Sequence, residues 1–299
     1  MRAIVKQAFY ACQRHAARLR LRWSSLDQHS RIRFAIFSLH TIADAASDMA
    51  VSEDCLRTQL AALLDAGYRC LDLPEALRVL AGSDPLPQPA FCLTFDDGYR
   101  SVYDPGLQIL EDLDLTATLF ITVNFLDGLI RPPWHSRDAA LLREYAVYAA
   151  HFQPLDWPQL REMIAGKRVR VGSHSLNHFM TGHLEEDDLR AEICQSKEIL
   201  ENRLGVEVPF FAYPYGVRPY GAYSLRSEAI LRQAGYRCSC TSRISRAAVG
   251  AGAWLLPRIS LVGSDTALDA RAKAAGFYDW VALAQNSFHG FFPNPHRPQ

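Results

Sequence analysis

The sequence lacks an excess of charge of either sign, because 32 Lys and Arg balance 32 Asp and Glu. Such a chain offers no basic surface to a phosphate backbone, so nucleic-acid binding is not expected. It also lacks an apolar run that approaches the roughly 20 residues of a transmembrane helix. Its first thirty residues contain no apolar core of a secretory signal. We therefore expect a cytoplasmic protein without membrane-spanning helices.

The cysteines lack the spacing of a metal or disulfide framework. Seven are present, an odd number, with no CxxC pair, and several lie inside apolar runs such as Phe91-Cys92-Leu93. Zinc–thiolate sites need closely spaced cysteines, and extracellular disulfide scaffolds usually have an even number. The simplest interpretation is a set of buried, reduced thiols in a reducing compartment.

The first thirty residues are basic and amphipathic. Their basic side chains are interleaved with apolar and aromatic ones, and include Lys6, Arg14, Arg18, Arg20 and Arg22. This composition allows a helix that lies on an anionic membrane surface and associates the protein with it peripherally. It equally allows a solvated helix docked on the main domain. The sequence leaves both alternatives open.

The rest of the chain predicts one large α/β domain. Its 299 residues are 49% hydrophobic, which is enough for a single large core. Short apolar strands alternate with helical segments from residue 33 to about residue 262. This alternation predicts a parallel sheet, and its repetition favours a closed barrel over an open sheet. We expect a basic extension over 1–30, a barrel domain over 31–265, and a C-terminal helix with a proline-rich tail over 266–299.

Polar residues follow four of the predicted strands. His40 ends the first, Asp96 and Asp97 end another, His174 follows a third, and Tyr213 to Tyr215 follow a fourth. In barrels of parallel strands the carboxyl ends carry the chemistry, so these clusters are expected to converge on one face. The stretch 126–156 reads as long and irregular, and a connection of that length is usually functional.

Two of these clusters have the composition of a metal site. Asp96 and Asp97 are adjacent, so on an extended backbone their carboxylates point in opposite directions and can take different roles. His174 and His178 are separated by three residues and can converge. Two neutral imidazoles and one carboxylate make a three-ligand site with open positions for water and substrate. A metal ion there would acidify a water molecule and polarise a carbonyl group.

The motifs resemble those of the NodB-like polysaccharide deacetylases, carbohydrate esterase family 4. The matching segments are Thr94-Phe95-Asp96-Asp97-Gly98, His174-Ser175-Leu176-Asn177-His178 and Phe211-Ala212-Tyr213-Pro214-Tyr215-Gly216. The resemblance covers about residues 33–262. It implies a distorted (β/α) barrel of the NodB-homology type in a single domain.

The resemblance also implies roles for individual residues. Asp97, His174 and His178 would hold a divalent metal, with Zn²⁺ expected and Co²⁺ or Ni²⁺ accepted. Asp96 would be the general base that takes a proton from the attacking water. The backbone N–H of Tyr215 would help to bind the oxyanion of the tetrahedral intermediate.

The chain departs from the family pattern at two points. Ala212 stands where the family usually has an arginine, and the segment Leu255 to Ile259 has no histidine where the family has its general acid. Loss of a positioned acid typically costs about 10²–10⁴ in rate. His40 is our candidate for the acid, which resembles the poly-N-acetylglucosamine deacetylase branch; the alternative is a histidine that merely caps a strand. Arg258 would replace the missing arginine if its guanidinium reaches Asp96.

Aromatic side chains supply candidate substrate contacts. Trp134 lies in the long 126–156 stretch, and aromatic rings stack on sugar faces. Tyr213 and Tyr215 sit in the third motif. For all three, plain packing in the domain is the alternative.

The sequence therefore predicts a metal-dependent hydrolase. Its reaction would remove N-acetyl groups from an amino sugar in a polysaccharide, such as an exopolysaccharide, or in a lipid-linked saccharide. One alternative keeps the metal and changes the substrate to another acylated sugar or small amide. A second alternative is a carbohydrate-binding pseudoenzyme, since residues of the third and fifth motifs are replaced.

Overall fold

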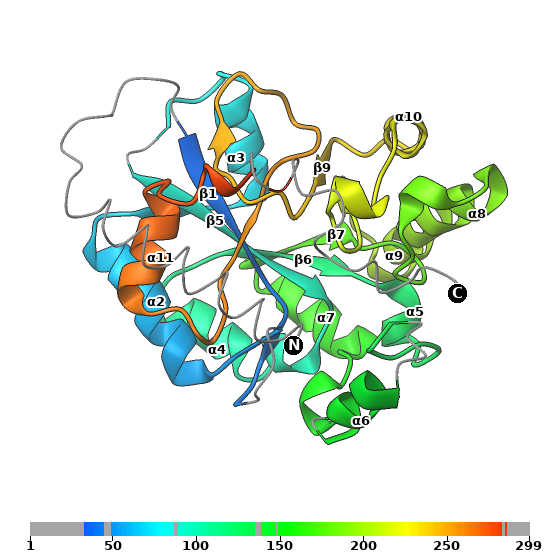
Figure 1. Cartoon of the computed structure of the whole chain (residues 1–299), viewed down its shortest axis with the longest axis horizontal. Coiled ribbons are helices and arrows are strands. Elements are labelled where there is room, and N and C mark those ends of the chain that lie inside the picture. Colours follow the sequence, from blue (N-terminus) through cyan, green and yellow to red (C-terminus); the bar gives the residue numbers. More distant parts are fainter. Residues whose placement is uncertain are drawn as a thin grey trace.

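A curled parallel sheet forms the centre of the computed structural model (Figure 1). The structure describes residues 33–44, 49–86, 89–134, 139–147, 149–282 and 285. The predicted extension over 1–30 and most of the proline-rich tail lie outside these residues. The main strands follow the order β1 (Arg33–Leu39), β5 (Ala90–Asp97), β6 (Ala117–Ile121), β7 (Val169–Ser173), β8 (Phe210–Ala212) and β9 (Cys238–Cys240).

Short strands complete the sheet at its edges. β4 (Arg69–Leu71) pairs with β5, and β10 (Ala247–Ala248) pairs antiparallel with β1. β11 (Ile259–Ser260) pairs with β1, while Leu256 just before it forms a bridge to Cys240 in β9. The segment from 256 to 260 therefore joins the two edges of the curled sheet, which is a distorted barrel as predicted. β2 (Thr41–Ile42) and β3 (Ala50–Val51) form a separate two-stranded sheet.

Helices cover the outside of the curled sheet. Several begin at side-chain caps: the Ser52 hydroxyl accepts from the backbone N–H of Cys55, and Asp156 and Ser224 form capping boxes. α11 packs along α2. The α-helices are α2 (Glu53–Asp65), α3 (Leu73–Leu80), α4 (Gly106–Asp112), α5 (Val123–Leu126), α6 (Ala139–Val147), α7 (Trp157–Ala165), α8 (Glu186–Arg190), α9 (Ser196–Leu204), α10 (Leu225–Gln233) and α11 (Ala267–Ala274).

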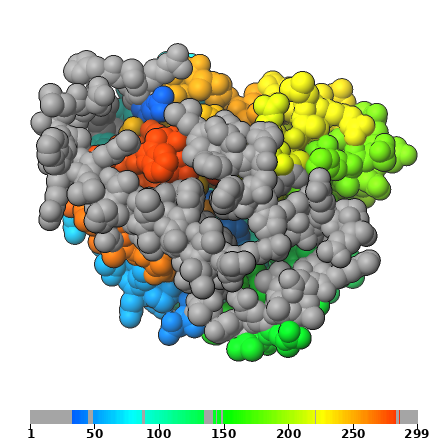
Figure 2. Space-filling view, viewed as in Figure 1, coloured from blue at the N-terminus to red at the C-terminus, as the bar shows by residue number. Residues whose placement is uncertain are grey.

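Shorter helical turns connect these elements. Between α8 and α9 the helix continues through a π-helical turn, η4 (Ala191–Gln195). In the space-filling view the green and yellow surface at the upper right comes from this part of the chain and from α10 (Figure 2). The remaining turns are 3-10 helices: η1 (Arg100–Val102), η2 (Ala149–Phe152), η3 (Thr181–His183) and η5 (Arg218–Tyr220).

The alternation of side chains in β5 shows how the sheet divides the core. Phe91, Leu93 and Phe95 pack in the larger hydrophobic cluster, together with residues of α2, α4 and α7. Cys92 points the other way, into a second cluster that β8 and β9 line inside the barrel. Thr94 and Asp96 share the direction of Cys92, because residues two apart face the same side of a strand. This alternation carries Asp96 into the barrel at the carboxyl end of β5.

Two expectations about local structure need correction. The stretch 126–156 is not irregular throughout, since it contains α6 and η2. Residues 255–261 are mostly apolar, which predicts a strand, but only Ile259–Ser260 pairs with the sheet beyond the single bridge at Leu256. In 126–156 the prolines and charges hide the short helices, whereas in 255–261 the positive φ of Leu255 and the missing N–H of Pro257 interrupt the strand. No helix in the described ranges combines the length and the apolar character needed to cross a membrane.

Candidate active site

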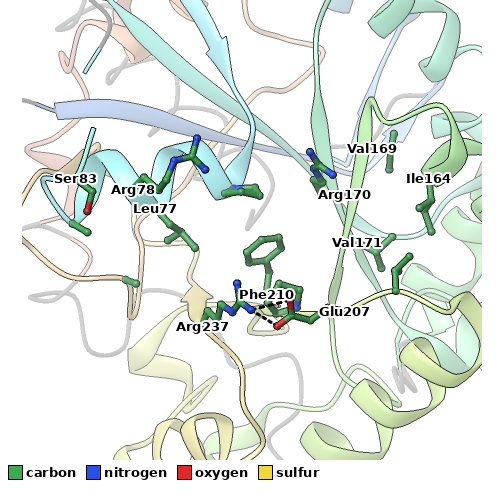
Figure 3. A pocket seen from close by; sticks show the side chains of 15 residues that line it. Leu77, Arg78, Ser83, Ile164, Val169, Arg170, Val171, Glu207, Phe210 and Arg237 are labelled. Carbon is green, nitrogen blue, oxygen red and sulfur yellow. Dashed lines mark hydrogen bonds and ion pairs between the residues drawn. The ribbon is translucent and has the colours of Figure 1, made fainter. Parts of the chain in front are cut away.

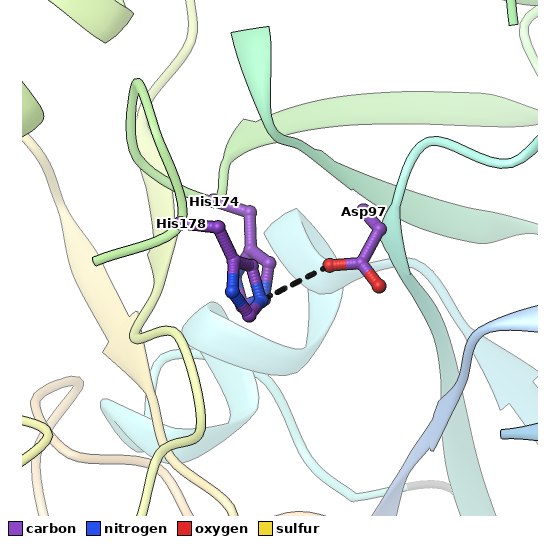
Figure 4. Close-up of side chains that lie close together, drawn as sticks. All are labelled: Asp97, His174 and His178. Carbon is purple, nitrogen blue, oxygen red and sulfur yellow. Dashed lines mark ion pairs between the residues drawn. The ribbon is translucent and has the colours of Figure 1, made fainter. Parts of the chain in front are cut away.

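Asp97, His174 and His178, hereafter the acid–histidine cluster, meet at the carboxyl ends of β5 and β7 (Figure 4). The Nε2 atoms of His174 and His178 lie 3.5 and 3.3 Å from Oδ1 of Asp97. All three side chains are buried, and their candidate ligand atoms lie within 4.8 Å of one another. No other such group of three or more His, Cys, Asp or Glu occurs among the residues that the structure describes.

The protonation pattern of this cluster suits a cation. Nδ1 of His174 lies 2.8 Å from the carbonyl oxygen of Ala212, which can only accept, so Nδ1 carries the hydrogen and Nε2 has a lone pair. Burial lowers the pKa of His174 to about 4, so its imidazole is neutral at pH 7. Both carboxylate oxygens of Asp97 are buried without a hydrogen-bond donor in the described part of the chain. Lone pairs of a neutral imidazole and a carboxylate thus face each other, an arrangement that a divalent cation stabilises.

The pKa of Asp97 supports the same conclusion. Burial works to raise it, but the neighbouring His178 and the imidazoles of His40 and His174, when these are protonated, outweigh burial and hold the pKa below its ordinary value. The backbone contributes to the geometry, because Asp97 adopts a φ of 73° at the end of β5. Gly98 follows with a φ of 97°, and a β-carbon there would lie 2.8 Å from Cδ1 of Leu126. Glycine is therefore needed where the chain turns away from the site.

Asp96 is held by Arg258 in a buried, two-pronged ion pair. The Nη1 and Nη2 atoms of Arg258 donate to Oδ1 and Oδ2 of Asp96 at 2.6 and 2.7 Å. Nη1 also donates to the hydroxyl of Thr94 at 3.0 Å, and Nε donates to the carbonyl of Thr241 at 3.1 Å. Arg258 is 1% exposed. Burial opposes ionisation of Asp96, but the charge of Arg258 outweighs it and lowers the pKa below its ordinary value.

The sequence predicted that the guanidinium of Arg258 would reach Asp96 if Arg258 replaces the family's arginine, and the structure contains this contact. Ala212 leaves β8 without the family's arginine, and Arg258 reaches the same carboxylate from the segment between β9 and β11. The backbone there is constrained, since Leu255 has a φ of 56° and the N–H of Arg258 donates to the carbonyl of Arg243. The role of Arg258 in a reaction remains a prediction.

His40 lies at the carboxyl end of β1 on the same face. It is partly exposed, and its charge when protonated lowers the pKa of both Asp96 and Asp97. It is therefore close to both carboxylates and open to solvent. This position is compatible with the predicted general acid.

The rings of Tyr215 and Trp134 both pack against the imidazole of His178. The ring of Trp134 stacks on that imidazole with centroids 4.6 Å apart, and Tyr215 meets it edge-on at 4.8 Å. Trp134 is 6% exposed and also packs on Phe125, so it supports the site more than it offers a surface to a sugar. Tyr215 has a φ of 62°, a strained conformation for this residue type.

Gly216 secures the turn after β8 that contains Tyr215. It has a φ of 57°, and a β-carbon there would lie 2.4 Å from the backbone nitrogen of Ser242. Ser242 instead donates its N–H to the carbonyl of Gly216 at 2.9 Å. The turn after β8 is thus held tightly against the segment that follows β9.

Tyr213 lies apart from the acid–histidine cluster. Its ring is fully buried in a third hydrophobic cluster with Phe211, Tyr223 and Tyr236. A side chain in this position does not touch a substrate, so the expected contact through Tyr213 is corrected to packing. The reason is strand alternation: Tyr213 shares the direction of Phe211, opposite to that of Ala212.

The motifs gave no role to Tyr99, which the structure places beside Asp97. The ring is fully buried against Phe125 and Phe152, and its hydroxyl has no hydrogen-bond partner among the described residues. Burial and the charge of Asp97 raise the pKa of Tyr99 well above its ordinary value, so the hydroxyl keeps its proton. The only sequence signal was its place two residues after Asp97.

A separate pocket of about 570 Å³ opens at the amino ends of β7 and β8 (Figure 3). It has apolar walls and three arginines, Arg78, Arg170 and Arg237. Each arginine is paired with a carboxylate, on Asp84, Asp72 and Glu207 respectively. The pocket offers no uncompensated charge, and its strand ends are opposite to those of the acid–histidine cluster.

Comparison with known proteins decides the family. A family model described as "Polysaccharide deacetylase" matches residues 83–239, a range that contains both aspartates and both histidines of the site. The chain belongs to this family. The resemblance read from the motifs, and the hydrolase class that it implied, are thereby confirmed at the level of the family.

Individual members of the family differ from this chain in length and sequence. The poly-beta-1,6-N-acetyl-D-glucosamine N-deacetylase of Escherichia coli (strain K12) is 26% identical in an alignment of 213 positions that covers 61% of this chain and 30% of that protein. The chain thus spans less than a third of that curated relative.

Two solved structures share the fold. The Streptococcus pyogenes deacetylase PplD, solved in complex with acetate, superposes with a TM-score of 0.68 at 21% identity, covering 82% of this chain and 99% of that one. IcaB from Ammonifex degensii superposes with a TM-score of 0.65 at 24% identity, covering 83% and 99%. These likenesses confirm the NodB-type barrel.

Proposed function

We propose that the protein is a metal-dependent hydrolase that removes N-acetyl groups from an amino sugar in a polysaccharide or a lipid-linked saccharide. The observation that carries the proposal is the acid–histidine cluster beside a carboxylate, Asp96, that Arg258 keeps ionised. Membership of the polysaccharide deacetylase family supports the reaction class. The name of the E. coli relative supports poly-N-acetylglucosamine as the first substrate to test.

Asp97, His174 and His178 would hold the metal, and Zn²⁺ is the first candidate because two imidazoles and one carboxylate suit its tetrahedral preference. Co²⁺ and Ni²⁺ are alternatives with the same ligands. When bound, the ion would make a water molecule more acidic and polarise the acetyl carbonyl group.

The residues around the metal would move the protons. Asp96 takes a proton from the attacking water, and the ion pair with Arg258 orients its carboxylate for this task. The backbone N–H of Tyr215 donates to the oxyanion of the tetrahedral intermediate. His40 gives a proton to the amine as the C–N bond breaks, so the products are acetate and an amino sugar.

Acetate release from N-acetylglucosamine oligomers tests the proposal. We expect release by the intact protein with Zn²⁺, and a loss of about 10²–10⁴ in rate for Asp96→Asn. Asp72→Asn is the matched control, because it makes the same carboxylate-to-amide change at the α3 cap beside Arg170. Acetyl-xylan and small amides in the same assay separate the deacetylase from other hydrolases. Tight saccharide binding without acetate release would instead indicate a carbohydrate-binding pseudoenzyme.

The proposal of peripheral membrane contact through residues 1–30 needs its own experiment. Liposome pelleting of the intact chain is compared with that of a chain that begins at Ser30. We expect the intact chain to pellet more strongly with anionic liposomes, because of its basic N-terminal residues. Equal pelleting would contradict membrane contact and leave the deacetylase proposal untouched.

A further inference from the structure

The loop between the two histidines is bonded on both of its sides. On one side the N–H groups of Val123 and Asn124 donate to the carbonyls of Ser175 and Leu176, at 3.3 and 3.0 Å. Ser175 and His178 themselves have φ values of 69° and 60°. Non-glycine residues with positive φ need support from their surroundings. The loop that carries both imidazoles is therefore strained and held from outside.

On the other side a single carboxylate holds the loop. Oε2 of Glu192 accepts the backbone N–H groups of Leu176 and Asn177 at 3.1 and 2.9 Å. Oε1 accepts Nδ2 of Asn177 at 2.7 Å. Glu192 is 2% exposed. Three N–H donors therefore occupy both oxygens of this buried carboxylate.

The helix that carries Glu192 explains how the side chain reaches the loop. Glu192 lies in the π-helical turn η4, where the extra residue per turn shifts the register between α8 and α9. Ser196, one turn later, is also buried, and its hydroxyl contacts that of Ser173 in β7 at 2.8 Å. Two successive turns of the helix thus face β7 and the loop that follows it.

We propose that Glu192 is a positioning residue for the metal site. It fixes the backbone at Leu176 and Asn177, and through it the separation and orientation of the imidazoles of His174 and His178. The inference rests on the proposed metal site and goes beyond it, because Glu192 is not a ligand and lies outside the family's motifs.

Glu192→Gln is the informative substitution, because it keeps the size of the side chain and removes one acceptor. The remaining carbonyl oxygen can accept the two backbone N–H groups, but the new amide then presents hydrogens to Nδ2 of Asn177. Asn177 cannot turn its amide over without a loss, since its Oδ1 accepts from Nδ2 of Asn124 at 2.6 Å. The substitution therefore disturbs the loop between the histidines without opening a cavity.

The measurement is the Zn²⁺ dissociation constant of the chelator-treated, intact protein, by competition with a chromophoric chelator. Loss of a partner that orients metal ligands typically weakens metal binding by about 10–100-fold, and we expect this range for Glu192→Gln. The Co²⁺ absorption spectrum should change as well, because the ligand geometry changes. Asp72→Asn is the control for a carboxylate-to-amide change elsewhere in the fold, and should leave both readouts at the wild-type value.

The outcomes separate the proposed role of Glu192 from the proposed metal site itself. Wild-type Zn²⁺ affinity and Co²⁺ spectrum in Glu192→Gln, with a lower melting temperature of the metal-free protein, would mean a purely structural role and overturn the inference. Wild-type affinity in Asp97→Asn would overturn the metal site itself. If Glu192→Gln does not fold, Asn177→Ala decides, because it removes one of the three donors and leaves Glu192 in place. Weakened Zn²⁺ binding supports the inference, and unchanged binding contradicts it.

Discussion

Arg258→Met leaves the Asp96 carboxylate buried without its cation. In the native structure this carboxylate accepts two short hydrogen bonds from a guanidinium that is 1% exposed. Methionine keeps the unbranched apolar stem but has no donor, so the substitution also leaves the carbonyl of Thr241 without the N–H of Arg258. The variant thus removes one partner of a buried pair and changes the packing volume little.

The size of the effect follows from this burial. Breaking a buried ion pair by removing one partner typically costs about 3–5 kcal/mol in the free energy of unfolding. At about 2–4 °C per kcal/mol for a domain of this size, the melting temperature should fall by about 6–20 °C. The rate of acetate release should fall as well, because Asp96 loses the charge that keeps it ionised.

A double variant separates the ion pair from simple packing. Asp96→Asn in the Arg258→Met background removes the unpaired charge, so the double variant should unfold at a higher temperature than Arg258→Met alone. Thermal unfolding of the two single variants and the double variant measures this coupling. Melting temperatures that are equal for wild type and Arg258→Met, or additive losses in the double variant, would refute the reasoning.

Three further predictions concern the acid, the metal and the turn after β8. His40→Ala should lower the rate of acetate release by about 10²–10⁴ while the Zn²⁺ affinity stays unchanged, and near wild-type turnover would remove His40 from the mechanism. Chelator treatment should lower the melting temperature, and Zn²⁺ at about a hundred times its dissociation constant should restore about 2.7 kcal/mol of stability; equal unfolding curves would contradict a metal that binds the folded state. Gly216→Ala should destabilise the protein by at least about 1–2 kcal/mol in denaturant unfolding, because it combines a positive φ with a β-carbon 2.4 Å from the nitrogen of Ser242, and an unchanged midpoint would contradict that geometry.

The pH dependence of stability has a defined sign for Asp96. Arg258 holds its pKa in the folded state below the ordinary value of 3.8, despite burial. A depressed carboxylate pKa contributes stability that is fully present above the unfolded value, and that is lost as the pH falls through the folded value. Unfolding midpoints of wild type and Arg258→Met should therefore differ most above about pH 4 and converge in more acidic solution. A gap that widens on acidification would contradict this sign.

The regular elements were predictable because their patterns are local. Strand β5 is a continuous apolar run that ends in two aspartates, and the helix over 185–204 has apolar residues at helical spacing. Strand β5 lies where this apolar run predicts it, and residues 186–204 are helical through α8, η4 and α9. The helix α6 was missed, since prolines around it suggested an irregular loop.

The residues of the site could be predicted from the sequence only where a family motif contains them. Asp97, His174 and His178 come together as their strand-end positions implied, and Arg258 reaches Asp96 although 162 positions separate them. The predicted substrate contact of Tyr213 was wrong, because the motif does not show which side of β8 each residue faces. Tyr213 faces the same side as Phe211, away from the acid–histidine cluster. Glu192 could not be found, since its contacts depend on a π-helical turn and on a loop 15 residues earlier in the chain.

The most direct test of the account measures acetate release from an N-acetylglucosamine oligomer by one protein preparation in three states: as purified, after chelator treatment, and after Zn²⁺ is restored. The account predicts that chelation abolishes release and that Zn²⁺ restores it in the wild type but not in Asp97→Asn, because this carboxylate is the anionic member of the acid–histidine cluster. Release that continues in the chelated protein, or that Zn²⁺ restores equally in Asp97→Asn, would contradict a metal-dependent deacetylase built on Asp97, His174 and His178.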